Sequence, residues 1–186
     1  MKRRIVIISG APGSGKTTLA GPLAAELGLP LFTKDTVKET LDDMLGDQRR
    51  DGVEWSSRLG AAAMELLWRL AGDAPACVLE ANFLPGHERQ RQKLSELTQG
   101  GLLVEVYCAC PAKVADSRYQ ARHGTPARHR IHTNNMTLEG YAAYAGPVGL
   151  GPVVEVDTTT RMTVAEVAER VRSEAVKAGL GLTHGE

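Results

Sequence analysis

The residue types at positions 10–17 suit the binding of a phosphate chain, because they read Gly-Ala-Pro-Gly-Ser-Gly-Lys-Thr and match the pattern G-x-x-x-x-G-K-[ST]. The three glycines permit positive φ angles, so the backbone N–H groups of residues 13–17 can converge on an anion. Lys16 adds a positive charge for the β- and γ-phosphates of a nucleotide, and Thr17 offers a hydroxyl to Mg²⁺. We expect the nucleotide cradle to consist of Gly10, Ala11, Pro12, Gly13, Ser14, Gly15, Lys16, Thr17 and Thr18.

The flanking segments support a phosphate-binding role for this loop. Residues 4–9 are an apolar, β-branched run with the length of a buried strand. Residues 16–27 follow as a helical pattern that ends near Gly28. A strand, a glycine-rich loop and a helix N-terminus in this order form an anion site, so the pattern predicts a nucleotide and Mg²⁺ there.

Strand-like and helix-like patterns alternate along the rest of the chain. We predict strands near 3–9, 29–33, 76–82, 102–108 and 152–156. We predict helices at 16–27, 36–45, 54–71, 86–98, 111–122, 137–145 and 163–178. This alternation indicates an α/β fold with three layers, in which a five-stranded parallel sheet lies between helices. Ligands of such sheets bind beyond the carboxyl ends of the strands.

A carboxylate, Asp35, follows the strand predicted near 29–33, within reach of a bound γ-phosphate. Such a carboxylate can accept the proton of an attacking hydroxyl or hold Mg²⁺ through water. We expect Thr36 and Glu39 to form a capping box for the next helix, which leaves Asp35 for chemistry. Lys38 either reaches a substrate anion or is a solvated surface lysine.

The strand predicted near 76–82 carries a second candidate carboxylate, Glu80. Many proteins with a phosphate-binding loop have an acidic residue here that orients Mg²⁺ or its water. The alternative is that Glu80 pairs with Lys16 or with another neighbour in the fold. Asn82 and Phe83 follow, and we expect them to contact a second substrate.

Residues 117–138 contain four arginines and three histidines but no Asp or Glu. These basic residues are Arg118, Arg122, His123, Arg128, His129, Arg130 and His132. Arginine suits phosphate because its fork makes paired hydrogen bonds, and Arg118 and Arg122 are spaced to share one helix face. We interpret residues 123–136 as a lid that closes over a nucleotide. The alternative is a nucleic-acid or surface patch.

Composition favours one globular unit spanning residues 1–186, with 42% apolar and 24% charged residues. The 22 basic and 22 acidic residues cancel, whereas nucleic-acid scaffolds usually have a basic excess. No stretch is long enough to span a bilayer, and three cysteines without an export signal suggest reduced thiols in a cytoplasm.

The helical patterns within residues 36–71 are expected on the acceptor side of the site. An apolar stripe at three- and four-residue spacing predicts the buried face of the second of these helices. The stripe consists of Trp55, Leu59, Ala62, Leu66 and Leu70. Trp55 and Arg58, at its N-terminal end, are expected to border the acceptor pocket.

On these motifs, the chain resembles the small P-loop kinases of the AAA group, which are related to chloramphenicol phosphotransferase, gluconate kinase, zeta toxins and the kinase domain of bacterial polynucleotide kinases. The resemblance rests on the phosphate-binding loop, Lys34-Asp35, Glu80 and Arg118-x-x-x-Arg122. It implies that Asp35 activates the acceptor hydroxyl, that Arg118 lies against adenine and that Arg122 meets phosphates. Asp157-Thr158-Thr159 is similar to the adenine-side loop of these kinases, which implies a nucleotide contact for Thr158. The chain differs from the usual pattern in carrying Glu rather than Asp at position 80.

The resulting hypothesis is an ATP- and Mg²⁺-dependent phosphotransferase that moves the γ-phosphoryl group to a hydroxyl of a small-molecule or nucleotide-like acceptor. Charge on the transferring group would be neutralised by Lys16, Arg122 and Arg128. Thr17 would hold the metal with Glu80 behind it. One alternative is a polynucleotide 5′-hydroxyl kinase that uses the arginine block as a groove. The other is a nucleotide-dependent switch that hydrolyses ATP.

Overall fold

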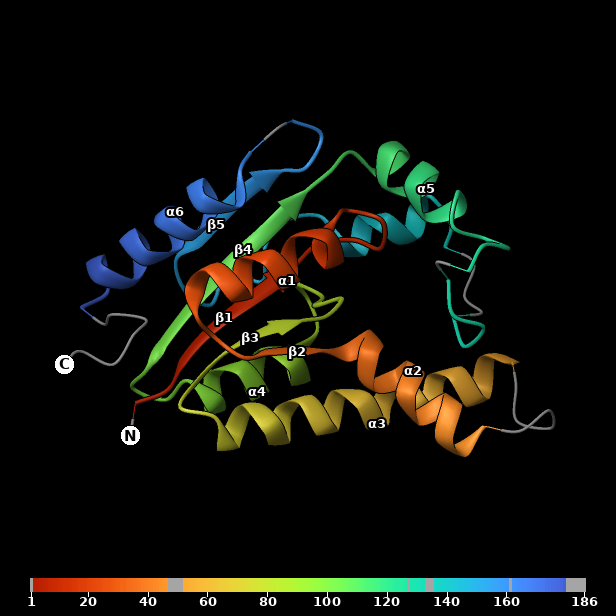
Figure 1. The fold of residues 1–186 in the computed structure, drawn as a ribbon, viewed down its shortest axis with the longest axis horizontal. Helices are drawn as coiled ribbons and strands as arrows, with labels where there is room; N and C mark the ends of the chain where they lie inside the picture. Colours follow the sequence, from red (N-terminus) through yellow and green to blue (C-terminus); the bar gives the residue numbers. More distant parts are fainter. Residues whose placement is uncertain (1, 47–51, 127, 133–135, 161, 180–186) are drawn as a thin grey trace.

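A computed structural model describes residues 2–46, 52–126, 128–132, 136–160 and 162–179 of the chain. Five parallel strands form one sheet in the spatial order β2-β3-β1-β4-β5 (Figure 1). They are β1 (Arg4–Ser9), β2 (Leu31–Thr33), β3 (Ala76–Glu80), β4 (Leu102–Ala109) and β5 (Val153–Asp157). The predicted five-stranded parallel sheet is therefore confirmed, and every strand lies within two residues of its expected bounds.

Helices connect the strands as the alternating pattern predicts. They are α1 (Lys16–Leu27), α2 (Lys34–Leu45), α3 (Gly52–Asp73), α4 (Glu88–Leu97), α5 (Ala112–Gln120) and α6 (Val164–Lys177). The segment predicted as a helix at 137–145 forms a 3₁₀ helix instead, η1 (Glu139–Tyr144). Gly140 within it and Gly146-Pro147 after it disfavour a longer α-helix.

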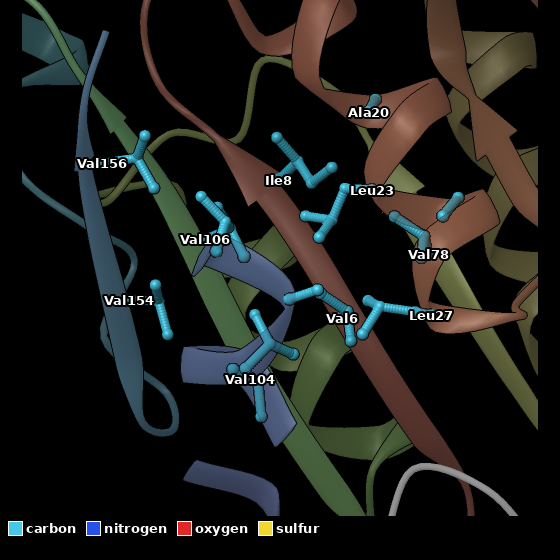
Figure 2. Packing of buried hydrophobic residues seen from close by; sticks show 14 of the residues in the cluster. Val6, Ile8, Ala20, Leu23, Leu27, Val78, Val104, Val106, Val154 and Val156 are labelled. Carbon is cyan, nitrogen blue, oxygen red and sulfur yellow. The ribbon is translucent and has the colours of Figure 1, made fainter. Parts of the chain in front are cut away.

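The sheet is covered on both faces, which gives the three layers expected of the fold. Alternate side chains of β1 enter different cores: Val6 and Ile8 pack with α1 and α6, whereas Ile5 and Ile7 pack with α3 and α4. Figure 2 shows the first core, where Val6 and Ile8 lie beside Leu23 of α1. Burial on both faces explains why the strands read as continuous apolar runs.

A buried carboxylate fixes the carboxyl end of β1. Glu105, on β4, has no exposed surface and accepts hydrogen bonds from the Ser9 hydroxyl and from the N–H groups of Val148 and Gly149. These three bonds satisfy a charge that would otherwise be costly to bury. They also hold the end of β1, where the phosphate-binding loop begins, against the neighbouring strand.

The helices α2 and α3 run side by side beyond the β2 edge of the sheet (Figure 1). The predicted stripe of α3 is partly wrong: Leu59 is buried, but Ala62 and Leu66 face outward. The buried positions are Ser56, Leu59, Ala63, Leu67, Trp68 and Ala71. Because α3 packs against both the sheet and α2, it also buries the small residues Ser56, Ala63 and Ala71. A search for large apolar residues at helical spacing does not select these positions.

Within the described residues, no helix is both long and apolar enough to cross a membrane. Of the segment expected to form a lid, 123–136, residues 127 and 133–135 lie outside the described part of the chain.

Candidate active site

The loop between β1 and α1 has the backbone that its glycine spacing predicts. Gly10, Gly13 and Gly15 adopt φ angles of 130°, 79° and 95°, and no non-glycine residue in the described part of the chain has a positive φ. Gly15 is the N-cap of α1 and provides no side-chain cap, so the first N–H groups of the helix remain for a ligand. A polyphosphate there would also meet the positive end of the helix dipole.

Gly13 places the loop directly on α5. A Cβ atom at this position would lie 2.1 Å from the carbonyl oxygen of Ala115, which is far inside van der Waals contact. The loop can therefore approach α5 only with a glycine at this position. Because Arg118 and Tyr119 are on α5, this contact also sets their position relative to the loop.

Replacing Gly13 with Ala is expected to lower nucleotide affinity by at least about tenfold, because a Cβ is disfavoured both by the positive φ and by the contact with α5. Gly21→Ala is the matched control, since Gly21 lies within α1 and nothing is within 4 Å of its Cβ position. The control should stabilise the protein by up to about 1 kcal/mol through helix propensity. Calorimetric titration with ATP and urea unfolding measure the two effects, and equal responses of the two variants would contradict this reading of the loop.

Two polar groups of the loop have environments that suit the binding of an anion. Lys16 is buried, and its Nζ donates to the carbonyl oxygens of Gly10 and Ala11 at 2.9 and 2.8 Å. Burial lowers the pKa of Lys16, and the nearby negative charge of Glu80 opposes this effect. The Ser14 hydroxyl is buried with no hydrogen-bond partner in the described structure. A bound phosphate would compensate the charge of Lys16 and give the Ser14 hydroxyl a hydrogen-bond acceptor.

A first cavity, of about 490 Å³, lies beside the loop between α5 and the segment after β5. Its lining includes Gly13, Gly15, Lys16, Thr17, Thr18, Arg118, Arg122, Asp157 and Thr158. Arg118 reaches across it, donating to the backbone oxygen of Thr158 at 3.0 Å and to its hydroxyl at 3.2 Å. The first cavity thus brings Arg118 and Thr158 together with the loop residues Gly13, Gly15 and 16–18, as the sequence predicts for the nucleotide. The other loop residues assigned to the nucleotide, Gly10, Ala11, Pro12 and Ser14, do not line it.

A second cavity, of about 360 Å³, lies on the other side of the loop, between α2, α3 and the end of β3. Its lining includes Pro12, Asp35, Lys38, Ser56, Glu80, Asn82, Tyr119, Arg128, His132 and Tyr144. Gly13, Lys16, Thr17 and Arg122 line both cavities. The two cavities therefore meet at the lysine and threonine of the loop, where the terminal phosphate of a nucleotide would lie.

Asp35 faces the second cavity from the first turn of α2. The predicted capping box is wrong, because α2 begins two residues earlier and its N-cap is Thr33, whose hydroxyl accepts a hydrogen bond from the Thr36 N–H at 3.2 Å. Thr33 has the extended backbone that an N-cap requires, at φ −112° and ψ 134°. The Asp35 side chain is 42% exposed and lies 3.7 Å from Lys34 Nζ. Asp35 thus takes no part in the cap and remains open to a ligand.

Glu80 ends β3 at the wall of the second cavity and is almost fully buried. Burial raises its pKa from 4.5 to about 7, while the Lys16 charge opposes this shift and the Asp35 charge adds to it. No ion pair within 4.0 Å joins Glu80 to Lys16 in the described structure, so the alternative of a direct pair is not supported. The described residues contain no group of three or more His, Cys, Asp or Glu that could hold a metal.

The Glu80 shift predicts a pH dependence of stability without ligands. Since the folded pKa is raised, the unfolded chain loses this proton more readily, and stability falls as pH rises from about 4.5 to about 7. Across this window Glu80→Gln should gain on the order of 3 kcal/mol relative to wild type, from the size of the shift. Urea unfolding of the metal-free proteins between pH 5 and 8 measures the difference. If the free energies of unfolding of wild type and Glu80→Gln change in parallel with pH, burial does not disfavour the charged form of Glu80.

An aromatic ring holds two of the predicted arginines in the site. The guanidinium carbons of Arg128 and Arg122 lie 4.4 and 5.9 Å from the centroid of the Tyr119 ring. Arg128 also donates to the Tyr119 hydroxyl at 2.9 Å and to the backbone oxygen of His132. Arg122 lies in the turn after α5, because the helix ends at Gln120, and it still lines both cavities. Arg118 and Arg122 therefore line the same cavity, although only Arg118 lies on α5.

The acid-free stretch of 117–138 receives its counter-charges from α2. Arg130 pairs with Asp42 at 2.9 Å, His129 with Asp43 at 3.1 Å and His132 with Glu39 at 2.7 Å. Arg130, one of the four arginines that the sequence suggests for binding an anion, therefore already has a carboxylate partner within the protein. Sequence patterns within one segment cannot show charges that another helix supplies.

The wall of the second cavity differs in part from the sequence prediction. Phe83 is not a substrate contact: it is buried in the core, with its ring centroid 6.0 Å from that of Trp68. Asn82 does line the cavity. Trp55 and Arg58 do not line it, and the Trp55 indole donates to Asp42 at 2.8 Å. Ser56 lines it instead, although nothing in its sequence context marks it.

A parallel sheet with a phosphate-binding loop after its central strand, and with a cavity on each side of that loop, defines a kinase-like P-loop fold. The chain belongs to a family of such P-loop proteins, the AAA domain family AAA_33, whose model matches residues 5–147. No curated protein sequence matches the chain significantly.

Solved structures with the same fold include several kinases. One from Chloroflexus aurantiacus J-10-fl, provisionally described as a kinase, has a TM-score of 0.79 and 27% identity over 94% of this chain and 99% of that one. A gluconokinase from Sinorhizobium meliloti 1021 has a TM-score of 0.54 and 20% identity over 95% and 93%. A shikimate kinase from Acinetobacter baumannii, solved with shikimate, has a TM-score of 0.56 and 13% identity over 96% of each chain. The last two likenesses show the fold alone.

Proposed function

We propose that the protein is an ATP- and Mg²⁺-dependent phosphotransferase that moves the γ-phosphoryl group to a hydroxyl of a small-molecule acceptor. The observation that carries this proposal is the pair of cavities that meet at Lys16, Thr17 and Arg122. A hydrolase or a switch needs room for a nucleotide and a water, whereas a transferase needs a second cavity for the acceptor. The kinase-like relatives support the same reaction class.

The nucleotide would lie in the first cavity, with its phosphates on the loop N–H groups and its base against Arg118 and Thr158, which are hydrogen-bonded to each other. Thr17 would hold Mg²⁺ through its hydroxyl, and Glu80 would act on the metal through water. Bound Mg²⁺ supplies positive charge that neutralises the phosphate oxygens. The positive φ angles of the loop glycines and the buried Ser14 hydroxyl fit a bound phosphate chain.

The acceptor would lie in the second cavity with its hydroxyl toward Asp35. In the transfer step the hydroxyl oxygen forms a bond to the γ-phosphorus, the bond from that phosphorus to the bridging oxygen breaks, and ADP leaves with the bonding electrons. Asp35 accepts the hydroxyl proton. Lys16, Arg122 and Arg128 would stabilise the charge on the transferring group. Mg²⁺ contact through water is the alternative role for Asp35.

The polynucleotide kinase alternative has less support, because much of the basic block is committed within the protein. Arg130 pairs with Asp42, and His132 pairs with Glu39. A groove for a nucleic-acid backbone needs several exposed and unpaired cations along one path.

The test is ADP formation by the purified protein with Mg²⁺-ATP, alone and with pooled hydroxyl acceptors. The pools are nucleosides, sugars, aminoglycosides, phenicols and 5′-hydroxyl oligonucleotides. We expect one small-molecule pool to raise the rate toward roughly 1–100 s⁻¹, the usual range for a kinase. A slow rate that no pool changes would favour the nucleotide-dependent switch.

A further inference from the structure

Lys38 differs from an ordinary surface lysine in its position. It lies on α2, lines the second cavity and is only 6% exposed, so the solvated alternative is wrong. Its Nζ donates to the Ser56 hydroxyl of α3 at 2.7 Å. The Lys38 and Lys34 side chains pass beside Gly60 of α3, where a Cβ atom would lie 4.0 and 3.9 Å from their Cε atoms, in ordinary van der Waals contact.

The Lys38 ammonium has more hydrogen-bonding capacity than the protein uses. It carries three N–H donors, and Ser56 is its one acceptor within the described structure. No described carboxylate lies within the 4.0 Å of Nζ that would define an ion pair, although Asp35, Asp42 and Glu39 act on it from farther away. Burial and the Lys34 charge lower the pKa of Lys38 to about 8. A buried cation with unused donors at a cavity wall suits an anionic group of a ligand.

The other cations of the second cavity have partners or face the loop. Lys34 lies near Asp35, Arg128 bonds Tyr119 and His132, and Lys16 bonds the loop carbonyls. Arg122 borders both cavities. Lys38 borders only the second cavity, so its charge is placed for the acceptor and not for the nucleotide.

The spacing of Lys38 from Asp35 limits the size of the acceptor. The two residues are three positions apart on α2, so they share one helix face with Cβ atoms about 5–6 Å apart. The hydroxyl that faces Asp35 and an anion that faces Lys38 can therefore belong to one small molecule. A cavity of about 360 Å³ is of the size that holds such a ligand.

We propose that the second cavity binds a small hydroxy compound with one anionic group, a carboxylate or a phosphate, which Lys38 and Ser56 hold while a hydroxyl faces Asp35. This inference rests on the proposed function for the role of Asp35. The anionic group would accept from the free ammonium donors and from the Ser56 hydroxyl, which donates to no other group in the described structure.

Matched acceptor pairs test the charge requirement. D-gluconate is compared with glucitol for the carboxylate, and glycerol 3-phosphate with glycerol for the phosphate, by ADP formation with Mg²⁺-ATP. The variants are Lys38→Met, Lys38→Arg and Ser56→Ala, with Lys93→Met as the control because Lys93 is half-exposed on α4, lines neither cavity and pairs with Glu96. Melting temperatures establish that each variant is folded.

We expect at least one anionic probe to exceed its neutral analogue, and Lys38→Met to lower kcat/KM for that probe about 100-fold, mainly through KM. Lys38→Arg should recover part of the loss, and Lys93→Met should show none. Equal use of the charged and neutral members, or an equal loss on both in Lys38→Met, would overturn the proposal and leave the kinase function intact.

Direct binding separates failure of this proposal from failure of the kinase function. Each anionic probe is titrated calorimetrically into protein saturated with Mg²⁺-ADP. Binding that Lys38→Met abolishes and Lys93→Met preserves would support the anion site even if no probe is phosphorylated. Absence of both binding and phosphorylation for carboxylate and phosphate probes at millimolar concentration would overturn it.

Discussion

Asp35→Asn is expected to lower kcat for phosphoryl transfer by about 10²–10⁴-fold, the usual contribution of a positioned general base. Asn keeps the size of the side chain but cannot accept the acceptor proton. ATP affinity should change little, because Asp35 lines only the second cavity and takes no part in the helix cap. Calorimetric titration with Mg²⁺-ATP and steady-state kinetics with the preferred acceptor measure the two quantities.

Asp73→Asn is the control for this substitution, since Asp73 is exposed at the end of α3, away from both cavities. It should leave both ATP affinity and kcat as in wild type. If Asp35→Asn weakens Mg²⁺-ATP binding as much as it slows transfer, Asp35 is a metal ligand or a structural residue.

Lys16→Ala is expected to reduce kcat/KM for ATP by at least about 10³-fold, because it removes the one loop cation that borders both cavities. The fold should survive, since the Lys16 ammonium is buried at a cost that appears as its lowered pKa. Thermal unfolding of the ligand-free variant tests this separation of stability from activity. A variant that unfolds in parallel with its loss of activity would mean that Lys16 mainly supports the loop.

The sequence predicted those parts of the molecule in which local pattern determines structure. Gly10, Gly13 and Gly15 adopt the positive φ angles that their spacing requires. The continuous apolar strands form a sheet that is buried on both faces, because parallel sheets carry helices on each side. Arg118 and Thr158 meet because both lie near the carboxyl ends of adjacent strands, β4 and β5.

The remaining features depend on contacts between segments that are distant in sequence. The partners of Arg130 and His132 are on α2, so no inspection of residues 117–138 can find them. Ser56 becomes a cavity residue only because α3 packs against α2 and brings it 2.7 Å from Lys38. The cap of α2 was misplaced because Thr33 and Thr36 are both good N-cap residues, and only the backbone angles distinguish them.

Charge in the second cavity connects the proposed chemistry to the proposed substrate class. Glu80 is held with a pKa near 7, while Lys38 is held with a pKa near 8. Both shifts arise mainly from burial, so both groups gain from a ligand of opposite charge. Mg²⁺ would supply that charge for Glu80, and the acceptor anion would supply it for Lys38.

Recovery of the γ-phosphoryl group tests the central claim most directly. ATP labelled in its γ-phosphate is incubated with Mg²⁺, the protein and the acceptor pool that most increases ADP formation, and the label is separated between organic product and inorganic phosphate. The phosphotransferase account predicts that most of the label is on the acceptor and that Asp35→Asn abolishes this product. Label found only in inorganic phosphate, with every pool and in both proteins, would contradict it and indicate a nucleotide hydrolase.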